Sequence, residues 1–255
     1  MVVWKLSQRH LKNFDCGATF SNKTLHQMIY LNFMNWFTTF LLSSLGKKFT
    51  MALTGFFLIS FLIVHCSINA TIFYDDGGKI FTICAHFMAT NPIIRTLEIV
   101  LILGFLIHII QGLLLWKQNK NARPIKYAYD DNSASRWYSR SMTLLGTLIL
   151  LFLVIHTRNF WIPNRIHQFK TGEELPLYQM MLAKFRSPIE VVVYLLGCFA
   201  LFWHLLHGFK SAFQTLGWNH RRYNGLISFS GTAFSIIVPF ILAMMPVAIY
   251  FQWLK

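Results

Sequence analysis

The stretch that decides the fold runs from residue 47 to residue 74 and reads KKFTMALTGFFLISFLIVHCSINATIFY. Two lysines open it, and no charged side chain follows as far as Tyr74. A helix needs about 20 mainly apolar residues to cross the hydrocarbon core of a bilayer, so this segment is long enough to span a membrane. His65 lies inside it. A polar side chain at that depth is costly and requires a specific reason.

Four more charge-free runs follow this one, at residues 99–116, 141–157, 191–209 and 223–254. The chain is 55% hydrophobic and only 13% charged, which excludes an ordinary soluble domain. Tryptophans stand near the ends of the runs, where the aromatic belt of a membrane protein places them: Trp116, Trp161, Trp218 and Trp253. The sequence therefore predicts an all-α membrane protein, a bundle of five transmembrane helices.

A sixth uncharged run, residues 24–46, contains polar side chains such as His26 and Asn35 between apolar residues at helical spacing. This pattern is typical of an amphipathic helix that lies in the membrane interface rather than of a sixth span. We therefore divide the chain into an N-terminal extension with an interfacial helix, residues 1–46, and a five-helix domain, residues 47–255. Met34 offers an alternative translation start, in which case residues 1–33 are a start-site artefact.

The distribution of basic residues predicts the orientation of the helices. The N-terminal segment and the loops 117–140 and 210–222 hold six, six and three basic residues, 15 of the 23 in the chain. Basic loops face the cytoplasm, so the N-terminus is expected inside the cell and Lys255 outside. The net charge of +14 mostly reflects this asymmetry, and no nucleic-acid partner is needed to explain it.

Four histidines, each in a different apolar run, carry the functional argument: His65, His108, His156 and His207. His65 and His156 stand 17 and 16 residues from the inner, basic ends of their helices, so both belong to the outer half of the membrane. His108 and His207 stand nine and three residues from the inner ends, so both belong to the inner half. The spacing predicts an outer pair and an inner pair, offset by roughly 12 Å along the helix axes.

Two imidazoles from separate helices are typical axial ligands of haem b in electron transfer. Zinc prefers four ligands at one depth, and the scattered cysteines form no Cys-x-x-Cys motif that would indicate an iron–sulfur cluster or covalent haem. We therefore expect a bundle enclosing two stacked, non-covalently bound haems b. His204 lies one turn from His207 and is an alternative inner ligand that spacing does not exclude.

Three glycines, Gly55, Gly146 and Gly197, each precede a candidate ligand by ten residues. Each is therefore expected near the level of the other histidine pair, where a missing side chain would clear the edge of a porphyrin. Close packing of helices is an equal explanation of small residues in a membrane bundle.

Several motifs together resemble a known family. They are the stretch from Lys47 to His65, HFMATNP at residues 86–92, ARPIKY at residues 122–127 and HLLHGFKSAFQTLGWNH at residues 204–220. From Met34 to its end the chain is similar to the dihaem cytochrome b subunit of succinate dehydrogenase/fumarate reductase, in the form found in Bacteroidetes-type bacteria. In that family one haem ligand directly precedes a glycine, and His207, which precedes Gly208, matches it. The resemblance therefore favours His207 over His204 as the inner ligand. Leu205 stands where some members carry a proton-conducting glutamate, so that proton route is not expected here.

The resemblance implies a function and partners. The protein would anchor a flavoprotein and an iron–sulfur subunit to the cytoplasmic face of the bacterial cytoplasmic membrane and exchange electrons with menaquinone. We expect a basic inner surface to dock the iron–sulfur subunit, although surplus inner charge also follows from topology alone. Its residues are Lys117, Lys120, Arg123, Lys126, Arg136, Arg140, Arg221 and Arg222.

Charged residues at the helix ends are candidates for the haem propionates and for quinone. Arg140 and Lys210 are placed for the inner haem and Arg158 for the outer one, unless they are ordinary helix-end charges. A quinone site needs hydrogen-bond donors and a proton acceptor near a haem. The outer candidates are His86, Glu98 and Glu190, with Asn91, Arg158 and Asn159 beside them; an inner site around Ser135 and Trp137 is the alternative.

Two other functions fit the histidine pattern. One is the cytochrome b anchor of another quinone-linked dehydrogenase or of a hydrogenase. The other is a haem-free transporter in which the histidines relay protons. The succinate dehydrogenase subunit and the other cytochrome b anchors predict a haem absorption band, whereas the transporter predicts none.

Overall fold

The computed structural model describes residues 35, 38–74, 76–121, 141–218 and 220–254. The chain divides into two units, residues 1–46 and residues 47–255. Most of the first unit lies outside the described residues, and so does most of the interfacial helix predicted over residues 24–46. Residues 38–42 are helical, and Ser43 forms a bend before the first long helix.

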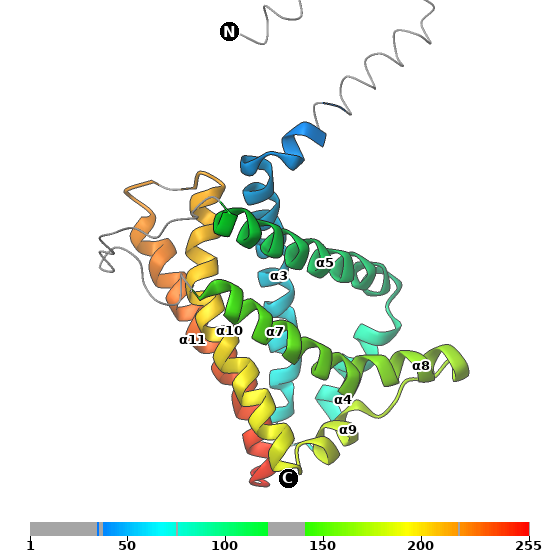
Figure 1. Cartoon of the computed structure of the whole chain (residues 1–255). Coiled ribbons are helices and arrows are strands. Elements are labelled where there is room, and N and C mark those ends of the chain that lie inside the picture. Colours follow the sequence, from blue (N-terminus) through cyan, green and yellow to red (C-terminus); the bar gives the residue numbers. More distant parts are fainter. Residues whose placement is uncertain (1–34, 36–37, 75, 122–140, 219, 255) are drawn as a thin grey trace, which may run out of the picture. The chain divides into compact units, whose positions relative to one another are not determined.

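The described part of the chain is helical and contains no strand (Figure 1). Its elements, in chain order, are α3 (Ser44–Ala70), the 3₁₀ turn η1 (Thr71–Phe73), α4 (Lys79–Thr90), α5 (Pro92–Asn121), α7 (Met142–His156), the π-helical turn η3 (Thr157–Trp161), α8 (Ile162–Thr171), α9 (Leu177–Lys184), α10 (Pro188–Thr215) and α11 (Asn224–Tyr250).

Five helical segments of the described chain are long and apolar enough to cross a membrane. They are Ser44–Phe73, Pro92–Asn121, Met142–Thr171, Pro188–Thr215 and Asn224–Tyr250. Each overlaps one of the five predicted runs, so the predicted all-helical class with five membrane-length helices is confirmed. Several segments extend beyond the charge-free runs because charged residues such as Glu98 and Lys117 continue the helix at its ends.

The third segment is longer than the charge-free run 141–157 because α7, η3 and α8 follow one another without a break. The π-helical turn begins directly after His156. An extra residue in the hydrogen-bonding turn rotates the side chains that follow, and such turns often occur at functional sites. Here the turn contains Arg158 and Asn159.

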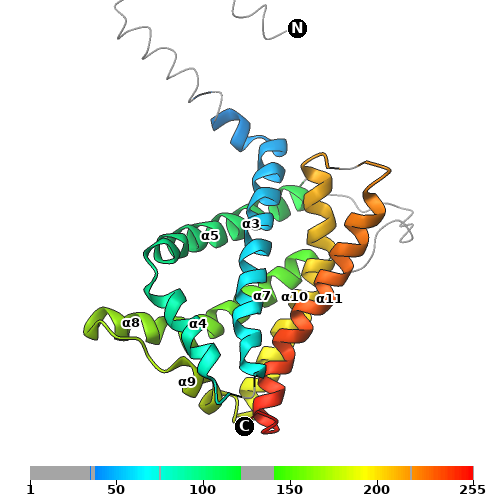
Figure 2. The same cartoon turned by 180° about the vertical axis from the view of Figure 1, so that it is seen from behind.

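Helices α10 and α11 lie side by side along most of their length, and α7 packs on α10 (Figures 1 and 2). Helices α10 and α11 approach closely where a small residue of one faces a large residue of the other. A Cβ at Gly231 of α11 would lie 2.6 Å from Cδ1 of Phe209 on α10. Helix α3 contacts its neighbours through long side chains instead, with Phe56 against Phe213 of α10 and Phe61 against Phe105 of α5.

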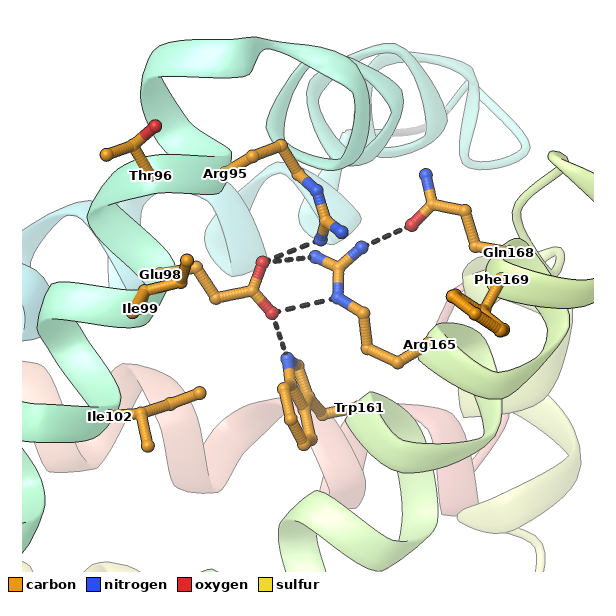
Figure 3. A pocket seen from close by; sticks show the side chains of 9 residues that line it. All are labelled: Arg95, Thr96, Glu98, Ile99, Ile102, Trp161, Arg165, Gln168 and Phe169. Atoms are coloured by element: carbon orange, nitrogen blue, oxygen red, sulfur yellow. Dashed lines mark hydrogen bonds and ion pairs between the residues drawn. The ribbon is translucent and has the colours of Figure 1, made fainter.

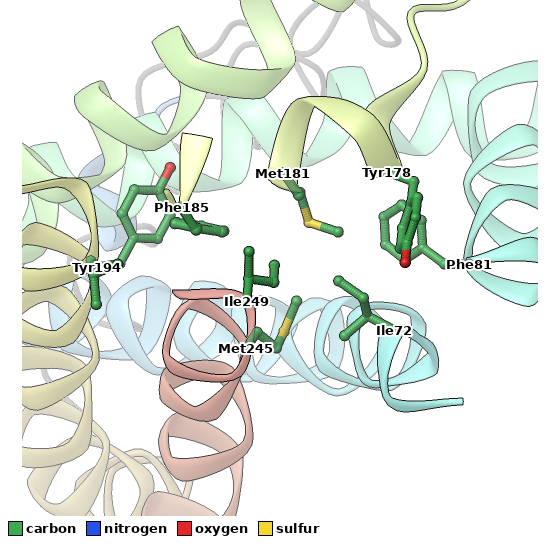
Figure 4. Close-up of a cluster of buried hydrophobic side chains, with 9 residues drawn as sticks. Ile72, Phe81, Tyr178, Met181, Phe185, Tyr194, Met245 and Ile249 are labelled. Atoms are coloured by element: carbon green, nitrogen blue, oxygen red, sulfur yellow. The ribbon is translucent and has the colours of Figure 1, made fainter. Parts of the chain in front are cut away.

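A buried apolar cluster lies at the predicted outer end of the bundle (Figure 4). Its members come from η1, α4, α9, α10, α11 and the turn after α9: Ile72, Phe81, Tyr178, Met181, Phe185, Val191, Tyr194, Met245 and Ile249. The short helices α4 and α9 therefore cover this end of the long helices. Burial of these side chains holds the ends of α10 and α11 in place against the helix that carries His156.

The outward side of α8 is apolar and its inward side is polar. Ile162 and Ile166 are exposed, and Phe169 is 94% exposed. On the opposite side Asn164 is buried, and its Oδ1 accepts a hydrogen bond of 2.8 Å from the backbone N–H of Leu175. This inverted pattern suits a helix that contacts lipid.

Candidate functional site

The outer histidine pair predicted from depth is brought together in the structure. The ring centroids of His65 on α3 and His156 at the end of α7 are 5.8 Å apart, with an interplanar angle of 87°. Phe61 stacks beside His65 at 5.3 Å, and Phe152 stacks beside His156 at 5.6 Å. The two imidazoles therefore lie edge to face between aromatic rings.

The inner pair also forms, but the ring of His108 on α5 contacts that of His204 rather than that of the predicted ligand His207. The ring centroids of His108 and His204 are 6.3 Å apart, at an interplanar angle of 65°. His207 lies one turn further along α10 and is half-buried. The ring contact therefore favours His204 as the partner of His108, whereas the family resemblance favours His207. Ligation by His207 stays a prediction.

Both ring separations fit a metal ion bound from two sides. A metal–nitrogen bond of about 2 Å on each side places the two ring centroids roughly 6 Å apart. Each ring can turn about its own metal–nitrogen bond, so neither interplanar angle is an obstacle. No group of three or more His, Cys, Asp or Glu side chains gathers within the described residues. A haem needs only two such ligands, because the porphyrin supplies the other four positions.

Each pair also contains a buried polar atom without a hydrogen-bond partner among the described residues. These atoms are Nδ1 of His156 and Nδ1 of His204. Oε1 of Gln111, one turn from His108 on α5, is a third. Buried polar atoms are nearly always hydrogen-bonded in folded proteins, so these three atoms are exceptions within the described residues.

Two of the three glycines singled out by spacing lie at the inner pair. A Cβ at Gly55 would be 3.6 Å from Cε1 of His108, and one at Gly146 would be 3.9 Å from Cε1 of His204. Gly197 lies at the outer level, where its Cβ would meet the Phe152 ring that stacks on His156. The predicted levels of these glycines are therefore confirmed.

A cavity of about 470 Å³ lies beside the end of α7 and the π-helical turn that follows His156. Its polar lining consists of Arg158, Asn159, Lys184 and Glu190, and its apolar walls are Ile155, Pro163, Ile189 and Val193. Nδ2 of Asn159 donates to Oε2 of Glu190 at 3.0 Å and to the hydroxyl oxygen of Tyr194 at 3.3 Å. The Tyr194 ring packs 5.8 Å from that of His156. Tyr194 thus joins this cavity to the outer histidine pair.

Glu98 lies in a different place, in a cavity of about 730 Å³ between α5 and α8 (Figure 3). Its carboxylate accepts hydrogen bonds from Nη1 of Arg95 at 2.7 Å and from Nε and Nη2 of Arg165 at 2.8 and 2.6 Å. The indole N–H of Trp161 donates to it as well, and Arg165 also bonds Gln168. Both carboxylate oxygens are therefore already occupied by protein donors.

Sequence reasoning missed this cluster around Glu98. The spacing of three residues between Arg95 and Glu98 could have indicated one ion pair on a helix surface. No signal in the sequence connects Glu98 to Arg165, because 67 residues separate them.

The other candidates for a quinone site lie elsewhere. Nδ1 of His86 contacts Oε1 of Glu174 at 2.5 Å, and the His86 side chain is 64% exposed. Asn91 is used as a helix cap, since its Oδ1 accepts hydrogen bonds from the backbone N–H groups of Ile93 and Ile94 at 2.9 and 3.3 Å. The structure therefore brings Arg158, Asn159 and Glu190 together and separates them from His86, Asn91 and Glu98.

The predicted inner residues are described only in part. Lys210 is exposed near the inner end of α10, Lys117 and Lys120 are exposed at the end of α5, and Arg221 and Arg222 are exposed between α10 and α11. The other inner candidates lie outside the described residues: Arg123, Lys126, Ser135, Arg136, Trp137 and Arg140.

Comparison of the chain with protein-family models, with curated proteins and with solved structures finds no match.

Proposed function

We propose that the protein is the membrane-anchor cytochrome b subunit of a bacterial succinate:quinone oxidoreductase, passing electrons between an iron–sulfur subunit and menaquinone through two haems b. The observation that supports this proposal best is the pairing of imidazoles from four membrane-length helices. Two pairs, with ring centroids 5.8 and 6.3 Å apart, join α3 to α7 and α5 to α10.

The residues around each pair fit a haem. His65 and His156 would hold the outer haem, and His108 with His207 or His204 would hold the inner haem. When bound, haem supplies a one-electron redox centre. The protein contributes the imidazoles and the aromatic rings beside them, and glycines let the rings of neighbouring helices approach closely at both levels. Arg158 for the outer haem, and Arg140 and Lys210 for the inner one, are proposed to pair with the propionates.

The cavity at Glu190 is our proposed quinone site. A quinol headgroup there would use the carboxylate of Glu190 as a proton acceptor, in competition with Asn159 and Lys184, which lie 3.0 and 3.1 Å from its oxygens. The apolar walls suit the ring and the isoprenoid tail. Tyr194 lies between this cavity and His156, so oxidation of quinol would occur beside the outer haem. Glu98 is a weaker candidate, because two arginines and an indole N–H hold its oxygens, whereas the oxygens of Glu190 are held by one amide and one lysine, Asn159 at 3.0 Å and Lys184 at 3.1 Å.

The partners follow from the same proposal. A flavoprotein and an iron–sulfur subunit would dock on the inner side, where exposed Lys117, Lys120, Arg221 and Arg222 provide positive charge. Opposite charge on a partner mainly speeds and orients its docking.

Difference spectra of membranes that express the protein with its neighbouring subunits test this proposal. We expect the dithionite-reduced minus oxidised spectrum to show the α band of haem b, with two haems per chain. His65→Gln and His156→Gln should each remove the same haem, whereas His86→Gln, a matched change of an exposed histidine, should leave both. A preparation of folded protein without an α band would contradict the proposal and favour the proton-coupled transporter.

The same measurement decides the inner ligand. If His204 is the ligand, His204→Gln loses the inner haem and His207→Gln keeps it. If the family resemblance holds at this position, the reverse is expected.

A further inference from the structure

Thr54 of α3 faces His108 of α5, one residue before Gly55. Its hydroxyl oxygen, Oγ1, is 3.1 Å from Nδ1 of His108. The same oxygen lies 2.9 Å from the carbonyl oxygen of Thr50 and 3.1 Å from that of Met51. The hydroxyl thus has three neighbours, two of which belong to its own helix.

A hydroxyl has one proton to donate, and a carbonyl oxygen can only accept. We assign the proton of Thr54 to the carbonyl of Thr50 or Met51, because without it two oxygens that both carry lone pairs would face one another at 2.9 Å. This assignment leaves an oxygen lone pair for His108 and selects the tautomer in which Nδ1 of His108 is the donor. A neutral imidazole with its proton on Nδ1 carries a lone pair on Nε2, so this contact prepares Nε2 to bind a metal ion.

The other histidines of the two ring pairs are held differently. Nδ1 of His156 and Nδ1 of His204 are buried and have no hydrogen-bond partner in the described part of the chain. Nδ1 of His65 lies 3.5 Å from Nδ2 of Asn69, which donates a shorter bond of 2.7 Å to the backbone oxygen of His65. Within these two pairs, His108 is the histidine whose Nδ1 bonds a hydroxyl from another helix.

We propose that Thr54 is a positioning residue for the inner haem: it holds His108 with the proton on Nδ1 and directs Nε2 to the iron. This inference rests on the proposed function and names a residue that acts through the ligand. A hydrogen bond at the second nitrogen fixes the ring and increases its electron donation to the metal, and loss of such partners typically weakens metal binding about 10–100-fold. Stronger donation stabilises the ferric state and lowers the reduction potential of the haem.

The test compares Thr54→Val with Thr54→Ser in the complete complex with bound haem. Valine has nearly the shape of threonine but lacks the hydroxyl, whereas serine keeps it. Thr232→Val on α11 is the matched control, because that exposed hydroxyl bonds the carbonyl of Ser228 at 2.9 Å and α11 carries none of the proposed ligands. The readouts are a redox titration that resolves the two haems and the EPR spectrum of their ferric forms.

For Thr54→Val we expect a higher midpoint potential and an altered EPR signal for the inner haem alone, with loss of that haem about 10-fold faster or more. Thr54→Ser and Thr232→Val should match the wild type. Complete loss of the inner haem in Thr54→Val, with both haems kept in Thr54→Ser, also supports the inference. Unchanged potentials and signals in Thr54→Val, equal changes at both haems, or a Thr54→Ser variant as altered as Thr54→Val would overturn it while leaving the proposed function standing. A wild type without haem would instead overturn the proposed function.

Discussion

Gly197 offers a direct test of packing at the outer histidine pair. A Cβ at this position of α10 would lie 2.5 Å from Cδ2 and Cγ of Phe152 and 2.9 Å from its Cε2. Carbon atoms pack best at about 3.5–4.0 Å, so the ring must move by roughly 1 Å. The Phe152 ring is held between two others: its centroid is 5.6 Å from that of the His156 ring and 5.1 Å from that of the Tyr194 ring. Gly197→Ala therefore overpacks a confined ring, at a cost of about 1–3 kcal/mol.

Gly208→Ala on the same helix is the matched control, because nothing lies within 4 Å of the position of its Cβ. Both changes replace glycine by alanine inside α10 and gain a similar helix propensity, up to about 1 kcal/mol. The propensity gain cancels when the two variants are compared, and the overpacking cost remains. At about 2–4 °C per kcal/mol for a domain of 150–250 residues, Gly197→Ala should melt roughly 2–12 °C below Gly208→Ala.

Thermal unfolding of the two purified variants in the same detergent measures this difference. A second change, Phe152→Leu, should restore part of the lost stability in the Gly197→Ala background, because it removes the ring that is displaced. Because Phe152 stacks on His156, the outer haem signal should also shift in Gly197→Ala. Equal melting temperatures for Gly197→Ala and Gly208→Ala, with no rescue by Phe152→Leu, would refute the packing argument.

Two further predictions concern carboxylates. The hydrogen bond from the backbone N–H of Ile80 is the main cause that lowers the pKa of Asp76 below its usual range. The charged carboxylate therefore stabilises the start of α4 at neutral pH. This contribution disappears as the pH falls through the lowered pKa. Asp76→Ala should therefore melt below the wild type at pH 7, and the gap should close in titrations below about pH 4; a constant gap down to pH 2 contradicts this account. Glu190→Gln should slow menaquinol oxidation about 100-fold or more in enzyme that keeps both haems, with Glu98→Gln as the control that keeps most of the activity. Normal turnover in both variants, with dicarboxylate activity intact, would move the quinone site to the inner side.

The sequence by itself determined the fold class and the positions of the main residues along each helix axis. A charge-free run such as residues 49–74 is enough to predict a membrane-length helix. A charged group is costly in hydrocarbon whichever way the helix is turned, so the prediction does not depend on the neighbours of the helix. The rise per residue then places each histidine along its axis. For this reason the pairing of His65 with His156, and the levels of Gly55 and Gly197, could be predicted without knowledge of how the helices pack.

Only the tertiary structure decided which side chains meet at a given depth. The rotation of α10 brings His204 rather than His207 to the ring of His108, although the two residues lie one turn apart. The π-helical turn after His156 and the cover formed by α9 place Asn159, Glu190 and Tyr194 together. Depth depends on residues along one helix, but rotation and choice of neighbour depend on the packing of all the helices at once, so contacts such as that of Thr54 with His108 are not encoded in any local pattern.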